Sequence, residues 1–189
     1  MQLHSPAATT REPIVREVIF EALYVRAIQP AAALQGALKR AGYDSDNRRP
    51  EYPASVLGQC LGATAAQILP GMSLPQAFQE LGRIFVRGIL STLLGKAIGP
   101  ALFMAGPERV MKRVPALVRS DFGMELKVSR MGPGLYQVVA APGTPLWSAE
   151  FHAGMFEELL RGARAEPSIV VAPPREPSSP FTLEIRWPG

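Results

Sequence analysis

The longest regular pattern of apolar and polar positions spans residues 73–95. Apolar side chains recur there every three or four residues, which is the spacing of a helix with one wide buried face. Ser73 and Gln76 are spaced as a capping box, and Pro75 suits the first turn of a helix. The pattern therefore predicts a long helix that begins after Ser73 and packs one face into the core.

Two glycines and three cations interrupt this helix. A glycine in a helix interior costs about 1 kcal/mol relative to alanine, so we expect Gly82 and Gly88 to mark close contact with a neighbouring backbone. We expect Arg83, Arg87 and Lys96 to reach outward. Because these cations leave no run of about 18 apolar residues, no membrane-spanning helix is predicted.

The rest of the first 120 residues is punctuated by prolines and glycines. Residues 1–12 are small and polar and predict a flexible arm, whereas residues 43–52 predict a polar surface loop. The β-branched residues of segment 14–28 favour a strand, although its apolar spacing also fits a helix. We predict a short extended entry there that leads into a helix. Further helices are predicted at residues 30–40, 53–68, 100–105 and 107–120, the last kinked near Pro115.

After residue 122 the pattern changes to alternation of apolar and polar side chains, which is typical of half-buried strands. The turn at residues 132–134 joins the first two strands into a hairpin, and residues 173–180 form a proline-rich loop. Helices followed by strands indicate an α+β class, with residues 13–189 as one domain. In it, an N-terminal helical half packs on a C-terminal four-stranded, mainly antiparallel sheet in the order β-β-α-β-β. The strands are predicted at 124–131, 135–141, 168–172 and 181–187, and the helix between them at 146–164.

Composition limits the classes of function. The chain has 189 residues, enough for one buried core, and 47% of them are hydrophobic, which excludes global disorder. The net charge of +4 is weak, and no basic run is interleaved with aromatics, which argues against nucleic-acid binding. The single cysteine, Cys60, excludes an intrachain disulfide and is expected to be a small buried hydrophobe. Without a signal-peptide pattern, the expected location is the cytoplasm.

Three motifs carry a family resemblance: ILPGMSLPQAFQELGR at 68–83, LSTLLGKA at 90–97 and FHAGMFEELLRGA at 151–163. In this order they resemble a large paralogous family of uncharacterised proteins, mostly from myxobacteria, over residues 14–187. That family brings no established activity. The order of helices and strands also resembles the fold of haem–nitric oxide binding and four-vinyl-reductase-like domains. This second resemblance implies a sensory or ligand-binding module.

The second resemblance makes haem the first cofactor to test. Haem needs an axial ligand, usually histidine, and the sequence contains only His4 and His152. His4 lies in the predicted arm, and His152 is expected to be a half-exposed residue at the start of the late helix. Those domains place their ligand in the helical half, where residues 109–119 contain no histidine. The Tyr-x-Ser-x-Arg pattern of haem–nitric oxide binding domains is also absent, so no cofactor is predicted.

Other chemistry has weak support. Asp44 and Asp46 resemble the opening of a calcium loop, but the glycine and final glutamate of that loop are missing. There is no Gly-x-Ser-x-Gly elbow and no phosphate-binding loop. Glu157 and Glu158 are adjacent on a predicted helix, so they point about 100° apart and are expected to form a solvated face. We therefore predict no enzyme and no metal site.

Two groups of residues remain as candidate sites. Arg109, Lys112 and Arg113 share one helix face, which is either a docking face for an acidic partner or an ordinary basic surface. Larger apolar side chains form either a pocket for a hydrophobic small molecule or plain core. The candidate pocket residues are Phe78, Leu81, Phe85, Ile89, Trp147, Phe151, Met155 and Trp187.

The predicted function is a non-enzymatic regulatory or sensory module that binds an apolar small molecule. The alternative is a structural protein–protein interaction module, a homodimer or adaptor, whose core is simply packed. The sequence identifies neither the ligand nor the partner.

Overall fold

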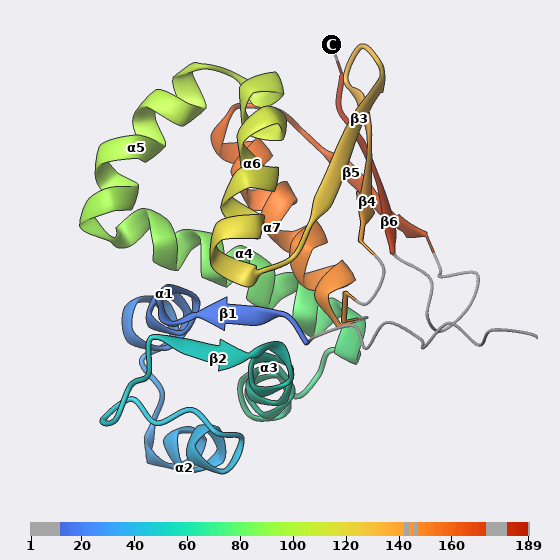
Figure 1. Cartoon of the computed structure of the whole chain (residues 1–189). Helices are drawn as coiled ribbons and strands as arrows, with labels where there is room; N and C mark the ends of the chain where they lie inside the picture. Colours follow the sequence, from blue (N-terminus) through green and yellow to red (C-terminus); the bar gives the residue numbers. More distant parts are fainter. Residues whose placement is uncertain (1–11, 142–143, 146, 173–180, 189) are drawn as a thin grey trace, which may run out of the picture.

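The computed structural model describes residues 12–141, 144, 145, 147–172 and 181–188. Nearly all of the predicted arm and the proline-rich loop at 173–180 lie outside these residues. The described chain is mainly helical in its first two thirds, and its last third forms a four-stranded sheet and one helix (Figure 1). The elements are β1 (Ile14–Arg16), α1 (Glu17–Phe20), the π-helix η1 (Glu21–Ile28), α2 (Ala32–Arg40), β2 (Glu51–Pro53), α3 (Ala54–Ile68), α4 (Leu74–Ser91), α5 (Leu93–Met104), α6 (Pro107–Phe122), β3 (Leu126–Gly132), β4 (Leu135–Ala140), α7 (Ser148–Gly162), β5 (Ser168–Ala172) and β6 (Thr182–Arg186).

The C-terminal sheet has four strands in the order β3-β4-β6-β5, and every neighbouring pair is antiparallel. Val138 of β4 pairs with Leu183 of β6, and both side chains are buried, because alternate residues of each strand face the helices. Figure 1 shows α6 and α7 against one face of this sheet. The predicted α+β class and the β-β-α-β-β sheet are confirmed.

Helix α4 lies between the two halves of the fold. Its N-terminus has the predicted capping box, in which the Ser73 backbone N–H donates to Gln76 Oε1 at 3.2 Å. A Cβ atom at Gly82 would overlap the Phe151 carbonyl oxygen of α7, and one at Gly88 would overlap the Ala22 carbonyl oxygen of η1. The predicted close backbone contacts at both glycines are therefore confirmed.

The long helix ends earlier than predicted. Thr92 has an extended backbone, with φ −69° and ψ 162°, and its hydroxyl oxygen accepts the Gly95 N–H at 3.0 Å. This N-cap begins a separate helix, α5, which continues through Pro100. No single helix in the described part of the chain is long and apolar enough to cross a membrane. In the described chain, one pair of helices together has the length and apolar composition of a membrane span: α4 and the Gly95–Met104 part of α5. These two helices are bent by 82° relative to each other.

A two-stranded sheet near the N-terminus was predicted only in part. The extended entry at Ile14 is confirmed as β1, but its partner β2 lies at the end of the segment predicted as a polar loop. Tyr43 and Tyr52 at the two ends of that segment are buried against Phe20, with ring centroids 4.7 and 4.6 Å away. The polar residues between the tyrosines obscured this signal, and strand pairing depends on a partner far along the chain.

Candidate functional site

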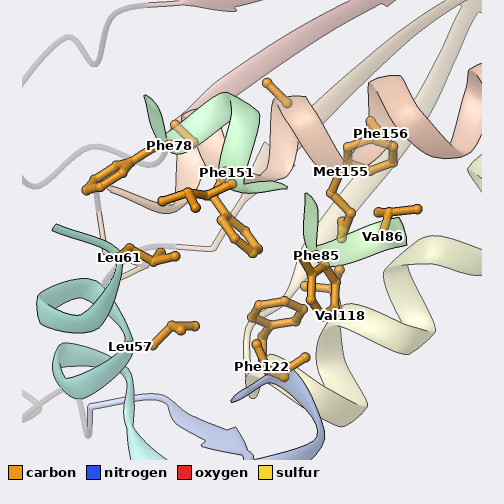
Figure 2. Close-up of a cluster of buried hydrophobic side chains, with 14 of the residues drawn as sticks. Leu57, Leu61, Phe78, Phe85, Val86, Val118, Phe122, Phe151, Met155 and Phe156 are labelled. Carbon is orange, nitrogen blue, oxygen red and sulfur yellow. The ribbon is translucent and has the colours of Figure 1, made fainter. Parts of the chain in front are cut away.

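The residues predicted to line an apolar pocket are mostly brought together in the core between α4 and α7. Figure 2 shows Phe78, Phe85, Phe151 and Met155 in one buried cluster. The rings of Phe85 and Phe151 are 5.6 Å apart, and Phe122 of α6 lies 5.6 and 5.9 Å from them. These centroid separations are those of directly packed aromatic rings.

The remaining pocket candidates divide between this core and the sheet. Leu81 is fully buried, whereas Ile89 and Trp147 are partly buried at its margin. Trp187, just after β6, is buried and stacks on Tyr136 of β4 at 5.1 Å. None of the surface grooves described below is lined by any of the eight candidates. A ligand between α4 and the sheet stays a prediction.

The described residues do not fit a haem. His152 is fully buried, with its ring 5.3 Å from that of Phe122 and 5.9 Å from that of Phe181. The expectation of a half-exposed histidine is wrong, because α7 begins at Ser148 and turns His152 inward. A haem ligand must face an open pocket, whereas this ring is enclosed by other rings. Helix α6 turns Val110 and its apolar neighbours, rather than a histidine, toward the core.

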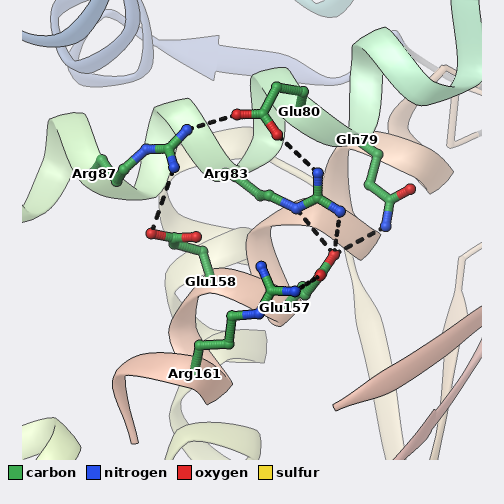
Figure 3. Close-up of polar contacts among 7 residues, drawn as sticks. All are labelled: Gln79, Glu80, Arg83, Arg87, Glu157, Glu158 and Arg161. Carbon is green, nitrogen blue, oxygen red and sulfur yellow. Dashed lines mark hydrogen bonds and ion pairs between the residues drawn. The ribbon is translucent and has the colours of Figure 1, made fainter. Parts of the chain in front are cut away.

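A polar network joins α4 to α7 (Figure 3). Glu157 is only 7% exposed, accepts hydrogen bonds from Arg83 Nη2 at 2.6 Å and Gln79 Nε2 at 3.0 Å, and forms an ion pair with Arg161 at 2.5 Å. The expectations that Arg83 reaches outward and that Glu157 lies on a solvated face are therefore wrong. The backbones of α4 and α7 are in contact at Gly82, so polar side chains at the edge of this contact bind each other instead of pointing into solvent.

The network continues along α4 and balances its charges. Arg83 and Arg87 each lie 2.7 Å from Glu80, and Arg87 lies 3.9 Å from Glu158. Burial alone would raise the pKa of Glu80, but hydrogen bonds from both arginines outweigh it and hold that pKa below its usual value. Three carboxylates are thus matched by three guanidinium groups, with Arg161 as the third, which is the pattern of a structural ion-pair network.

The other candidate reactive groups are also accounted for. Cys60 is fully buried, as predicted, and burial raises the pKa of its thiol to about 12. Asp44 and Asp46 both lie 3.1 Å from Lys39, so a cation of the chain already occupies the region that resembled a calcium loop. Within the described residues, no group of three or more His, Cys, Asp or Glu side chains could hold a metal ion.

The predicted docking face lies on α6, where Arg109, Lys112 and Arg113 are all exposed. Lys112 also borders a groove between α6 and β3 that was not predicted. The groove consists of two hollows, of about 640 and 520 Å³, which share Lys112, Pro115 and Leu126. The sequence alone does not reveal this groove, because it forms between a helix and a strand whose contact depends on the tertiary fold.

Two other grooves offer fewer unmatched charges. One of about 390 Å³ lies between η1 and α2, and its Arg48 is paired with Glu17 at 3.4 Å. Another of about 570 Å³ lies beside α4, and its Arg26 and Arg87 are paired with Glu21 and Glu80. Among these grooves of the described chain, the α6–β3 groove therefore has the most cations without a counter-ion.

Comparison with known proteins matches residues 14–188 to a family model described as a protein of unknown function, DUF2378. This agrees with the resemblance to an uncharacterised family, while a myxobacterial source stays a prediction. No curated protein matches the chain.

Among solved structures, the chain is similar to H-NOX proteins. An H-NOX protein from S. oneidensis in the Fe(II)NO state has a TM-score of 0.71 at 11% identity, over 93% of this chain and 100% of that one. The unliganded Fe(II) H-NOX protein from K. algicida has a TM-score of 0.66 at 11% identity, over 93% and 97%. An oxygen-binding H-NOX domain related to soluble guanylate cyclases has a TM-score of 0.66 at 11% identity, over 91% and 92%. At these identities the likeness shows a shared fold, as the order of elements had implied.

Proposed function

The chain belongs to the DUF2378 family of proteins of unknown function, and we propose that it is a sensory or regulatory module that recognises a small molecule without haem and catalyses no reaction. The fold supports the sensory part of this proposal. H-NOX proteins crystallised with nitric oxide or oxygen share their architecture with almost the whole chain. A fold by itself does not determine function, so the proposal depends on the residues inside it.

The observation that carries the haem-free part is the aromatic packing around His152. The histidine is enclosed by the rings of Phe122 and Phe181, and Phe85 and Phe151 pack beside them. A planar cofactor would have to displace several of these rings. Because each buried aromatic contributes on the order of 3 kcal/mol or more, that displacement opposes haem binding.

Haem content tests this proposal directly. The full chain would be produced with excess aminolevulinic acid and iron, beside an H-NOX protein prepared identically as positive control. Absorption spectra should show a Soret band for the control and none for this chain. Native mass spectrometry should instead detect a non-haem small molecule bound to the purified chain. Stoichiometric haem would overturn the haem-free part, and a consistently empty chain would argue against the sensory role.

A structural interaction module is the second candidate function. It is favoured by the close packing of α4 on α7, since a Cβ at Gly154 would also overlap a backbone carbonyl, that of Gln79. A core of this kind supports folding rather than ligand binding. A stable dimer in light scattering, together with an empty chain in native mass spectrometry, would favour this alternative. Homodimer formation is otherwise untested and stays a prediction.

A further inference from the structure

The groove between α6 and β3 has an apolar floor. On α6, residues three and four apart turn toward the strand, and among them Met111 and Pro115 are apolar. On β3, Leu126 and Val128 are two apart and so face the same side of the sheet. The two hollows share Pro115 and Leu126, which makes them one continuous groove.

The wider hollow is bordered by cations that lack counter-ions. Lys112, Arg119 and Lys127 are exposed, and none of them forms an ion pair within the part of the chain that the structure describes. Glu125 is the one carboxylate among the residues that line this hollow. At the other end of the groove, by contrast, Arg130 is matched by Glu108 at 3.0 Å.

This distribution of charge differs from that of the α4–α7 network, where three arginines are balanced by three glutamates. Lys112 and Arg119, two unpaired cations on the same face of α6, repel each other at low ionic strength. An anion placed between them would relieve that repulsion and accept charge-assisted hydrogen bonds. Lys112 and Arg119 are two helical turns apart, about 10 Å along α6, so an anionic head fits between their side chains.

The size of the hollow is suited to a small molecule. Its volume of about 640 Å³ lies within the usual range for ligand sites. We propose that it binds a small organic anion, in which a carboxylate or sulfonate head lies between Lys112 and Arg119. The apolar body of the ligand lies on Pro115 and Leu126. This inference rests on the proposed sensory function and places its ligand outside the packed core.

Two fluorescent probes with the same rings test the inference. Anilinonaphthalene sulfonate carries the anionic head, and phenylnaphthylamine lacks it. The full chain should bind the sulfonate at one site and at least about tenfold more tightly than the amine, a difference of about 1.4 kcal/mol. The double variant Lys112→Ala, Arg119→Ala should lose about tenfold in affinity for the sulfonate. It should leave the affinity for the amine unchanged. No sulfonate binding by the unaltered chain would overturn the inference.

Matched variants on the same helix provide the controls. Arg109 and Arg113 are exposed cations of α6 that do not line the groove, so the double alanine variant there should bind the sulfonate within about twofold of the unaltered chain. An equal loss at Arg109 and Arg113 would show general attraction to a basic helix and overturn the site.

A second pair of variants blocks the groove without removing a cation. Ala116 lines the hollow at an exposed position of α6, and the next residue, Leu117, is exposed but does not line it. Ala116→Glu should abolish sulfonate binding, whereas Leu117→Glu should not. Circular dichroism and thermal unfolding would confirm that both variants fold. Full binding by Ala116→Glu would contradict the proposed position.

Anionic vesicles distinguish a soluble ligand from a lipid headgroup. The chain should not sediment with phosphatidylglycerol vesicles; sedimentation that is lost in the Lys112→Ala, Arg119→Ala variant would assign the groove to membrane lipid and overturn the inference. If the groove variants change nothing while native mass spectrometry still finds a bound small molecule, the sensory function stands and this location fails.

Discussion

A missing side chain at Gly82 determines how closely two helices approach. The backbones of α4 and α7 are in contact at this residue, and Gly154 makes the reciprocal contact from α7. Glycine is costly in a helix, so its presence at such contacts reflects the packing gained. The sequence predicted close approach at Gly82 and Gly88, but the neighbouring elements became known only from the fold.

Replacing Gly82 with alanine should destabilise the protein by roughly 3 kcal/mol, because the added methyl group would force the two backbones apart. Gly62 of α3 provides the control, since a Cβ there meets no atom within 4 Å. Gly62→Ala should raise stability by about 0.5–1 kcal/mol through helix propensity. Urea unfolding followed by circular dichroism measures both. Equal effects of the two substitutions would show that the assigned contact face of α4 is wrong.

Cys60 should be inert in the folded state. Its thiol pKa is raised to about 12 by burial, so an aromatic disulfide reagent at about pH 8 should label it only after unfolding.

The raised pKa of Cys60 also makes its contribution to stability depend on pH. Below about pH 9 the thiol is neutral in both states, and its contribution is fully present. As pH rises from about 9 towards 12, only the unfolded state ionises, and this contribution is lost.

This predicted loss of stability at high pH can be tested by comparing the free energy of unfolding of the Cys60→Ala variant with that of the unaltered chain. The difference between them should shift in favour of the variant as pH rises above about 9. Rapid labelling of the folded chain at about pH 8 would contradict the buried position of the thiol.

At the scale of elements, the α4–α7 contact combines an apolar centre with a polar margin. Glu157 is central to that margin, because its carboxylate forms ion pairs with both Arg83 and Arg161. The spacing of apolar residues identified Arg83 as a polar position on an apolar helix. It could not show that the Glu157 carboxylate of α7 lies next to it. The two residues are 74 positions apart in the chain.

The substitution Glu157→Gln should destabilise the fold by about 2 kcal/mol, since it removes the buried negative charge that pairs with both Arg83 and Arg161. Glu184 pairs with Arg186 at 3.2 Å on the exposed face of the sheet and serves as the control. Glu184→Gln should change stability by less than about 0.5 kcal/mol. Thermal and chemical unfolding would measure both. A similar effect at the two sites would indicate that the network is only a surface feature.

The boundaries of elements were less predictable than their existence. Helix α4 ends at Ser91 because Thr92 caps the next helix, and the apolar spacing alone continued past that point. The strand β2 was missed because three residues provide too little alternation to detect. The four strands of the C-terminal sheet were recognised because two of them alternate apolar and polar residues, and the other two are short β-branched apolar runs bounded by turn residues.

For the whole molecule, α4 links the N-terminal helices to the sheet. It contacts η1 at Gly88 and α7 at Gly82, and α7 in turn packs on the sheet. We therefore expect the chain to unfold in one cooperative transition, as the prediction of a single domain over residues 13–189 requires. Calorimetric and van't Hoff enthalpies should agree, and Gly82→Ala should lower one transition without splitting it. Two separate transitions would instead indicate independent halves.

The candidate site was predictable only in part. The cations of α6 were recognised from their spacing, and the chain was expected to lack haem because its two histidines were poorly placed. The groove beside Lys112 could not be found in this way, because Lys127 and Leu126 come from a strand whose position next to α6 is a tertiary property. The burial of His152 was also missed, since one residue's exposure depends on what packs over it.

By itself, the sequence predicted most of the helices and the four strands of the C-terminal sheet. Periodicity and residue type are local properties, so they can be judged without knowledge of neighbours. Only the tertiary structure decided which side chains meet: Arg83 with Glu157, β1 with β2, and α6 with β3. Those meetings depend on the approach of whole elements, which is governed by backbone contact at glycines such as Gly82 and by packing in the core.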